Sequence, residues 1–257
     1  MRIIDSHAHY DDSSFDADRE EILRELFSGE ICKIVNIGCS VKSSYSSVKL
    51  AEEYAGIYAA VGLHPDAADE IDRIEEIRRL CDNKKVVAVG EIGLDYHYEE
   101  HSRDIQKKAF EEQLKLAAEL DMPVVIHSRD AWEDTMELLR KYRPKGVMHC
   151  FSGSAEIARE IVTMGMYVGF TGVVTFKNAK KALVSDAEGT LKEKLQEMSK
   201  KQFRDFIKKN IHKYRHVFFL SPFHTFILHK ICHPSTAIII SINPKKVIQK
   251  YISITYI

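Results

Sequence analysis

The chain has 257 residues, of which 45% are hydrophobic and 29% charged, and its net charge is -1 at neutral pH. This composition is typical of a soluble globular protein, and the length suits one large α/β barrel or two small domains. Because no run of eighteen apolar residues and no apolar leader occurs, we expect neither a membrane span nor a signal peptide. Five scattered cysteines argue against a disulfide framework and predict a cytoplasmic protein.

Seven short apolar runs alternate with charged, amphipathic stretches in the first 182 residues. They are RIID from Arg2, CKIVNIG from Cys32, IYAAVGLHP from Ile57, KVVAVGEIG from Lys85, MPVVIHSRD from Met122, GVMHCFSG from Gly146 and MYVGFTG from Met166. Short runs rich in Val, Ile and Ala, each followed by Gly, His or another polar residue, are typical of buried parallel strands.

The stretches between these runs have the character of helices. The clearest is SRDIQKKAFEEQLKLAAEL from Ser102, where one apolar face is formed by Ile105, Ala109, Phe110, Leu114, Ala117 and Leu120. Strands that alternate with helices predict a parallel sheet. Seven strands in succession, without a GxGxxG or Walker A loop, favour a TIM-type (β/α)8 barrel of the α/β class over a doubly wound sheet.

The pattern fails where the eighth strand is expected, so we predict a barrel that is incomplete after the seventh strand. Gly189 is the last glycine of the chain and Asp205 the last acidic residue. From Val184 onward, 13 Lys and Arg stand against 5 Asp and Glu, whereas residues 1–183 carry 24 against 33. We therefore divide the chain into a barrel portion, 1–183, and a divergent basic tail, 184–257. The tail's residue types are typical of a frameshift or read-through, with a divergent functional tail as the alternative.

Five of the predicted strands end on imidazole or carboxylate side chains. These are His7 and His9 after the first strand, His64 after the third, Glu91 after the fourth, His127 after the fifth and His149 after the sixth. In a barrel of parallel strands, the carboxyl ends meet at one mouth, where functional residues lie. Imidazole and carboxylate are ligands of divalent first-row metals. For any single histidine a hydrogen-bonded core position is the simpler interpretation, but the set predicts a metal site.

The number and type of these side chains suit a centre of two ions. His7 and His9 would hold one ion, His127 and His149 the other, and Glu91 would lie between them. Two ions bridged in this way lower the pKa of a shared water and bind a phosphoryl oxygen.

Together, DSHAHYDD, VGLHP, GEIGLDYH, QKKAFEEQLKLAAELDMPVVIHSRDA and HCFSGS resemble the TatD family of metal-dependent hydrolases, from Met1 to about Ala182. The resemblance implies a TIM-type barrel that binds two divalent ions and hydrolyses DNA phosphodiesters, in several members as an exonuclease. Carried over by motif, the metal ligands would be His7, His9, Glu91, His127 and His149. His64 matches a position near the reacting phosphate, and we count Glu91 and His64 as the catalytic candidates.

The family pattern continues with a strand ending in ETDxP, whose Asp completes the metal site, and this chain has no such motif. Asp186 follows the seventh strand too closely, Asp205 lies in a predicted amphipathic helix, and Ser221 stands where a carboxylate is wanted. We assign the final Asp to none of them. Because loss of one general base typically costs about 10² to 10⁴ in rate, we expect impaired activity.

Three further residues are candidates for contact with the substrate. Asp95 and Tyr96 follow Glu91 on what we expect to be a loop, where they would either contact the substrate or cap the loop. Arg129 would either bind a phosphate through both guanidinium nitrogens or pair with an acidic neighbour at a helix start.

The leading hypothesis is a metal-dependent phosphodiester hydrolase that acts on DNA, which we expect to be single-stranded. An amidohydrolase or lactonase on the same barrel is the first alternative, although Glu91 stands where such enzymes commonly carry a carboxylated Lys. A catalytically inactive, metal-binding remnant is the second. Zn, Mg, Mn and Ni all suit the ligand set, and we expect a monomer without a membrane partner.

Overall fold

The computed structural model describes residues 2–29, 31–98, 100–170, 237–239, 241–242 and 252–256. Its first seven strands are β1 (Arg2–Ala8), β2 (Ile31–Ile37), β3 (Ile57–Val61), β4 (Val86–Asp95), β5 (Val124–Arg129), β6 (Gly146–Met148) and β7 (Tyr167–Phe170). Each of the seven predicted strands is therefore confirmed.

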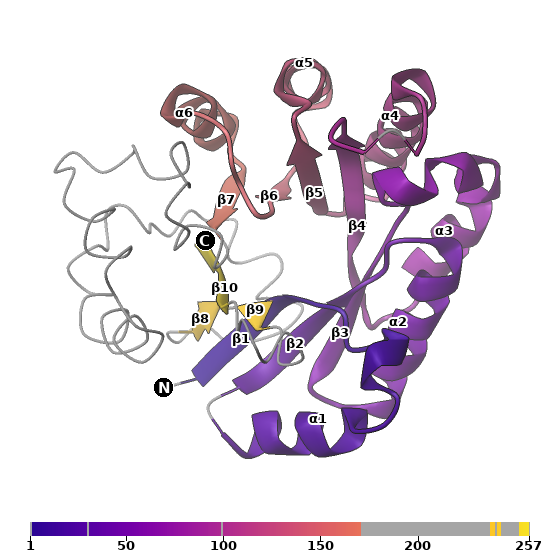
Figure 1. The fold of residues 1–257 in the computed structure, drawn as a ribbon, viewed down its shortest axis with the longest axis vertical. Helices are drawn as coiled ribbons and strands as arrows, with labels where there is room; N and C mark the ends of the chain where they lie inside the picture. Colours follow the sequence, from indigo (N-terminus) through magenta and orange to yellow (C-terminus); the bar gives the residue numbers. More distant parts are fainter. Residues whose placement is uncertain are drawn as a thin grey trace, which may run out of the picture.

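These strands form one curled parallel sheet in which the order in space follows the order in the chain. The helices lie on its outer side (Figure 1). They are α1 (Arg19–Ser28), α2 (Val41–Glu53), α3 (Ile74–Cys81), α4 (Arg103–Glu119), α5 (Trp132–Tyr142) and α6 (Ala155–Thr163), with 3-10 turns at Ser13–Phe15 and Pro65–Arg73. Strands inside and helices outside confirm the TIM-type barrel architecture.

Three short strands from the end of the chain flank the seven. β8 (Ala237–Ile239) pairs parallel with β1, whereas β10 (Ile252–Tyr256) pairs antiparallel with β7 and with β9 (Ser241–Ile242). An antiparallel neighbour of β7 departs from the all-parallel (β/α)8 pattern. The sequence predicts that this pattern ends after the seventh strand, but it does not predict the antiparallel pairing. The expected boundary at residue 183 lies outside the described residues.

The two faces of the sheet bury separate sets of side chains. On β2, Ile34 packs in the large core between strands and helices, whereas Val35 and Ile37 belong to a smaller cluster with Ala60 and Val125. Because successive side chains of a strand point to opposite faces, this smaller cluster marks the inner side of the curl. Its apolar side chains line this inner side of the sheet.

Helix α4 begins as predicted, with Ser102 accepting a hydrogen bond from the backbone N–H of Ile105. Its buried face keeps Ala109, Phe110, Leu114 and Ala117 from the prediction but also contains Gln106, Gln113 and Leu116. Ile105 is 40% exposed, whereas the neighbouring Gln106 is 3% exposed. The polar side chain is buried because it satisfies backbone groups at the end of β4, and a purely apolar criterion cannot detect that role.

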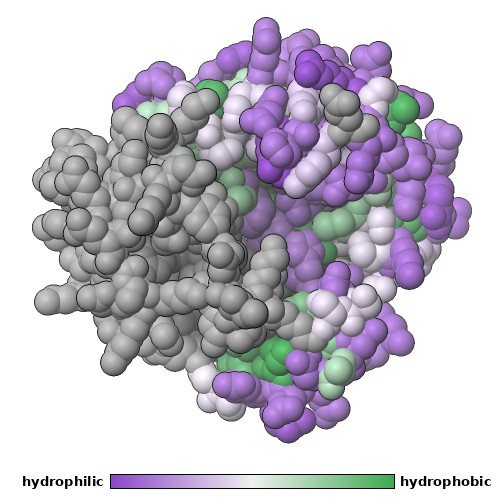
Figure 2. All heavy atoms as spheres, viewed as in Figure 1, coloured by the Kyte–Doolittle hydropathy of each residue, from purple (hydrophilic) through white to green (hydrophobic). Residues whose placement is uncertain are grey.

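The outer, helical side of the molecule is mainly hydrophilic (Figure 2). Among the described residues, every helix is too short or too polar to span a bilayer.

Candidate metal centre

Glu91 lies on β4 in the middle of the predicted ligands, and only 5% of it is exposed. One carboxylate oxygen, Oε2, lies 3.2 Å from His7 Nε2. The other, Oε1, lies 3.3 Å from His127 Nδ1. The two oxygens of one buried carboxylate therefore face imidazoles from opposite sides of the barrel mouth, β1 and β5. This is the geometry that a shared carboxylate needs.

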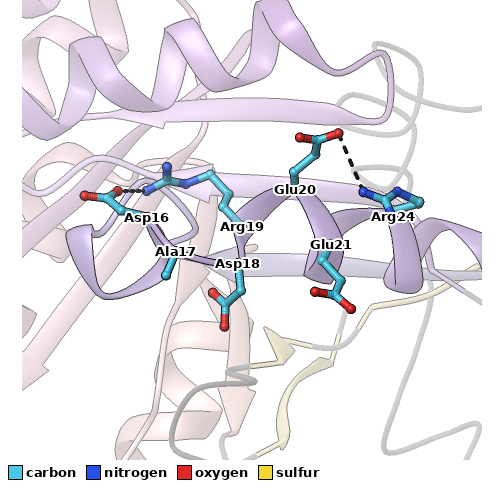
Figure 3. Close-up of a pocket in the computed structure, with 7 residues that line it drawn as sticks. All are labelled: Asp16, Ala17, Asp18, Arg19, Glu20, Glu21 and Arg24. Atoms are coloured by element: carbon cyan, nitrogen blue, oxygen red, sulfur yellow. Dashed lines mark hydrogen bonds and ion pairs between the residues drawn. The ribbon is translucent and has the colours of Figure 1, made fainter.

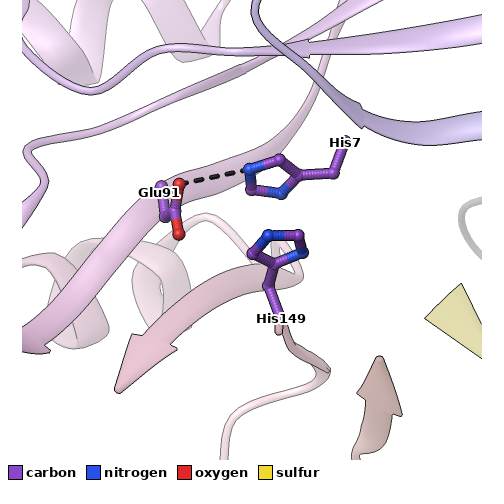
Figure 4. A group of neighbouring side chains, drawn as sticks. All are labelled: His7, Glu91 and His149. Carbon is purple, nitrogen blue, oxygen red and sulfur yellow. Dashed lines mark ion pairs between the residues drawn. The ribbon is translucent and has the colours of Figure 1, made fainter. Parts of the chain in front are cut away.

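The imidazoles of His7 and His149 lie face to face beside Glu91 (Figure 4). Their ring centroids are 3.4 Å apart and their planes differ by 8°. His9 joins them from the other side, with its Nε2 atom 3.1 Å from Nε2 of His7. Nδ1 of His9 lies 3.0 Å from the carbonyl oxygen of Ile37, which orients the ring. Three rings from β1 and the end of β6 thus converge on one carboxylate.

His64 and His127 form the second half of the cluster. Their ring centroids are 4.6 Å apart, at an angle of 64°. Nδ1 of His64 lies 3.2 Å from a carboxylate oxygen of Asp66 and accepts a hydrogen bond from the backbone N–H of the same residue. His64 therefore lies next to a candidate ligand, at the mouth where we expect it.

Three groups of three donors in the described residues are close enough to hold an ion, and all three contain Glu91. They are His7 with His149, His9 with Cys39, and His64 with His127, each together with Glu91, and within each group the donor atoms lie within 4.8 Å of one another. We expected His7 and His9 to hold one ion and His127 and His149 the other. These pairs differ from the pairs in the three groups, and the assignment of ligands to ions stays a prediction.

Cys39 was absent from the predicted ligand set, although the rule that found the histidines also applies to it. It lies two residues beyond the last residue of β2, where a polar side chain at the mouth is expected. The apolar run CKIVNIG ends at Gly38, so Cys39 falls one residue outside it. Burial raises the pKa of its thiol, and the negative charge of Glu91 adds to that effect.

Burial and charge hold His9, His149 and Glu91 in protonation states that suit metal ligands. Burial lowers the pKa of His9 to about 4, and it also lowers that of His149 well below the ordinary value. Burial alone would raise the pKa of Glu91, but the charge interaction with His7 and the hydrogen bonds with His127 and His7 outweigh it and lower that pKa. Neutral imidazoles with free lone pairs beside an ionised carboxylate are the states that bind a cation.

His127 differs from the other rings because it lies between two carboxylates. Burial would lower its pKa, but the hydrogen bonds to Asp95 and Glu91 raise it to about 9. Such a ring holds a proton at neutral pH until a metal ion displaces it. The donor set as a whole, buried imidazoles around a shared carboxylate, fits divalent first-row ions.

Asp95 lies on β4 and not on a loop, which corrects the prediction that the strand ends at Glu91. The sheet register places Asp95 opposite Arg129 of β5 and Gly93 opposite His127. At Gly93, where φ is +143°, a Cβ atom would collide with the carbonyl oxygen of His127, so only glycine permits this close pairing.

The carboxylate of Asp95 points at His127, with Oδ2 3.0 Å from Nε2, and the residue is 3% exposed. It also accepts a hydrogen bond from the backbone N–H of His97. Asp95 therefore orients a candidate ligand, as is common for the outer partner of a metal-binding histidine, and caps the turn after β4, which is the alternative weighed above; its contact with a substrate stays a prediction.

The other two substrate candidates also have partners within the protein. The Tyr96 hydroxyl donates a hydrogen bond to Asp134, and the guanidinium of Arg103 lies 4.4 Å from its ring centre. Arg129 lies over the exposed ring of Tyr98, 4.9 Å from its centre. Arg129 is thus placed near the mouth with an aromatic ring beside it, whereas the Tyr96 hydroxyl is already engaged.

The acidic residues after the first two histidines hold the loop in place. Asn36 of β2 donates a hydrogen bond to Asp11 and accepts one from the backbone N–H of Tyr10. Arg19 of α1 donates to the carbonyl oxygens of Tyr10, Asp11 and Asp12. These contacts fix the chain that leaves the barrel at His9.

A shallow pocket on the outside of the barrel is formed by the charged residues around the start of α1 (Figure 3). Its ion pairs, Arg19 with Asp16 and Arg24 with Glu20, join side chains of this one segment. None of the candidate metal ligands lines it, so it is separate from the metal centre. Asp186, Asp205 and Ser221, weighed above for the final ligand, lie outside the described residues.

The family model described as "TatD related DNase" matches residues 4–203. The uncharacterized metal-dependent hydrolase YabD of Bacillus subtilis is 44% identical over 186 residues, which cover 70% of this chain and 72% of that protein. The 3'-5' ssDNA/RNA exonuclease TatD of Shigella flexneri is 35% identical over 167 residues, 63% of this chain and 64% of that protein.

Among solved structures, the crystal structure of YjjV, a TatD homologue from Escherichia coli, superposes with a TM-score of 0.60. It is 34% identical, and the match covers 68% of this chain and 70% of that one. The matched segment thus spans about two thirds to three quarters of these relatives.

Proposed function

The chain belongs to the family of TatD-related DNases, which are metal-dependent hydrolases, and from this we propose that it hydrolyses the phosphodiester bonds of single-stranded DNA, as an exonuclease. The observation that carries the proposal is the arrangement around Glu91, whose two oxygens face His7 and His127 at 3.2 and 3.3 Å. The similarity to a relative named a 3'-5' ssDNA/RNA exonuclease supports the choice of substrate.

We assign His7, His9, Glu91, His127 and His149 to the binding of two divalent ions. When bound, such ions polarise a phosphoryl oxygen and lower the pKa of an attacking water. Glu91 would hold both ions at a fixed separation, because its carboxylate is buried and its two oxygens face different imidazoles.

The protein's other side chains would orient the nucleic acid. His64, 14% exposed in its side chain and adjacent to His127, is positioned to contact the reacting phosphate through its free ring edge. Arg129 would bind a second phosphate, since a guanidinium can donate two parallel hydrogen bonds. The exposed ring of Tyr98, which lies beside Arg129, offers a face on which a base of a single strand can stack.

The experiment is cleavage of a single-stranded oligonucleotide, labelled at either end, by the full chain with Mg or Mn. We expect stepwise shortening from one end, abolished by a chelator and reduced about 10²-fold or more by Glu91→Gln, which keeps the shape of the side chain but removes its charge. Glu20→Gln, an exposed position on α1, is the matched control and should cleave as the unmodified chain does.

Because the sequence has no ETDxP motif, we expect turnover to be slow, and the assay needs high enzyme concentration and long incubation. Cleavage that survives Glu91→Gln unchanged would contradict the proposal. So would a chain that binds metal and cleaves a lactone or amide but no oligonucleotide.

A further inference from the structure

The chain at the end of β2 contacts His64 and two of the candidate ligands through its backbone. The carbonyl oxygen of Gly38 accepts a hydrogen bond from the N–H of Glu91 at 2.8 Å, and that of Cys39 accepts one from the N–H of His64 at 2.9 Å. The carbonyl oxygen of Ile37 lies 3.0 Å from Nδ1 of His9. The position of Cys39 is therefore fixed by the same contacts that fix the metal centre.

The side chain of Cys39 lies among polar donors. Its Sγ atom is 3.9 Å from Nδ1 of His9, and the donor atoms of Cys39, His9 and Glu91 all lie within 4.8 Å of one another. At zinc bond lengths of about 2.0 to 2.3 Å, the donors of one tetrahedral ion lie about 3.3 to 3.8 Å apart. A small side-chain rotation would bring the three donors around one ion.

The alternation of side chains along β2 also places Cys39 on the inner side of the barrel, near the metal centre. Val35 and Ile37 face the inner side of the barrel, and Cys39 is the next residue in that alternation, at the level of the mouth. A cysteine commonly packs as a small apolar side chain, and Cys39 is half-buried. Here its neighbours include an imidazole and a carboxylate, which an apolar role does not require.

We propose that Cys39 is a ligand of the metal centre, together with His9 and Glu91, and that its sulfur makes the centre selective for zinc-like ions over Mg and Mn. The inference rests on the proposed metal centre but not on the identity of the substrate. On binding, the thiol proton passes to solvent and the sulfur donates as thiolate. Thiolate favours zinc and its neighbours, whereas Mg and Mn favour oxygen ligands.

The test is the absorption spectrum of the full chain loaded with Co(II), which reports on thiolate coordination directly. We expect a thiolate-to-cobalt charge-transfer band in the near ultraviolet that is present in the unmodified chain and lost in Cys39→Ser. Cys32→Ser, near the start of β2, is the matched control and should keep the band. A cobalt-loaded unmodified chain without the band overturns the proposal, and so does an undiminished band in Cys39→Ser.

A second measurement covers the case in which Cys39→Ser fails to fold. In the unmodified chain, alkylation by iodoacetamide is followed at each cysteine by peptide mapping, with and without zinc. We expect zinc to slow the labelling of Cys39 at least tenfold and that of Cys32 by less than twofold; equal labelling of Cys39 in both conditions overturns the proposal.

Selectivity is read from competition between zinc and manganese. We expect the preference for zinc to fall at least tenfold in Cys39→Ser, and an unchanged preference overturns the selectivity claim. The outcomes also separate this inference from the proposed function. The charge-transfer band without DNA cleavage supports Cys39 as a ligand and counts against the nuclease, whereas cleavage without the band does the reverse.

Discussion

At the scale of single residues, Asp95 and Glu91 hold His127 from its two sides and set its protonation. Nε2 faces Asp95 at 3.0 Å and Nδ1 faces Glu91 at 3.3 Å, and the pKa of the ring rises to about 9 against the effect of burial. In the metal-free protein, the protonated ring therefore stabilises the fold. That contribution is complete below the unfolded pKa of about 6.5 and is lost as pH rises through 9.

Metal binding should reverse this state, because an ion at His127 must displace the proton. We expect the full chain at pH 8 to release close to one proton from His127 on binding, measured by titration calorimetry in buffers of different ionisation enthalpy. Asp95→Asn removes one of the two charges that raise the pKa of His127. The number of protons released at pH 8 should therefore fall, and the release should occur at lower pH.

The control is Asp130→Asn, an exposed carboxylate that pairs with His97. It should release protons as the unmodified chain does. Equal proton release by Asp95→Asn and the unmodified chain at every pH would show that Asp95 does not govern His127.

The role of a single residue could be predicted where the order of strands alone determines its position. The histidines and Glu91 were predictable because the carboxyl ends of parallel strands converge. The role of Asp95 was not, because it follows from β4 continuing beyond Glu91 in register with β5. Cys39 could have been predicted by the rule that found the histidines, because it also follows the end of a strand.

At the scale of elements, α4 holds two strands at the barrel mouth through buried glutamines. The Gln106 side chain accepts a hydrogen bond from the N–H of Asp95 and donates to its carbonyl oxygen. Gln113, two turns further along, does the same for Leu63 at the end of β3. Helix α4 thus holds the chain at the ends of two strands. These are β3, which is followed by His64, and β4, which carries Asp95, the partner of His127.

Gln113→Leu should destabilise the fold, because the N–H and carbonyl groups of Leu63 would stay buried without a partner. At about 1–3 kcal/mol for each buried group left without a hydrogen bond, we expect a loss of about 2–5 kcal/mol in the free energy of unfolding, measured with urea. Lys108→Leu, an exposed position of the same helix, should change it by less than about 0.5 kcal/mol. A Gln113→Leu value within that range would refute the role.

The bounds of α4 were predictable from its serine cap and apolar spacing, but these glutamines were not. Spacing rules treat a polar residue as exposed, and Gln113 is entirely buried. A buried amide can be recognised only when the backbone groups that it satisfies are known.

At the scale of the whole molecule, the parallel curl of β1 to β7 brings residues 7 and 149 into contact, although they are far apart in the chain. This arrangement was predictable because seven apolar runs alternate regularly with amphipathic stretches. Beyond β7 the periodicity is lost, and the antiparallel pairing of β10 with β7 could not be foreseen from pattern alone.

The central claim is that one carboxylate, Glu91, organises the whole metal centre, since each three-donor group in the described residues contains it. The most direct measurement is the zinc content per chain, by elemental analysis after dialysis, of the unmodified protein, Glu91→Gln and Glu20→Gln. We predict up to two ions per chain in the unmodified protein and in Glu20→Gln, and loss of most of the metal in folded Glu91→Gln. A folded Glu91→Gln with unchanged metal content would contradict the account.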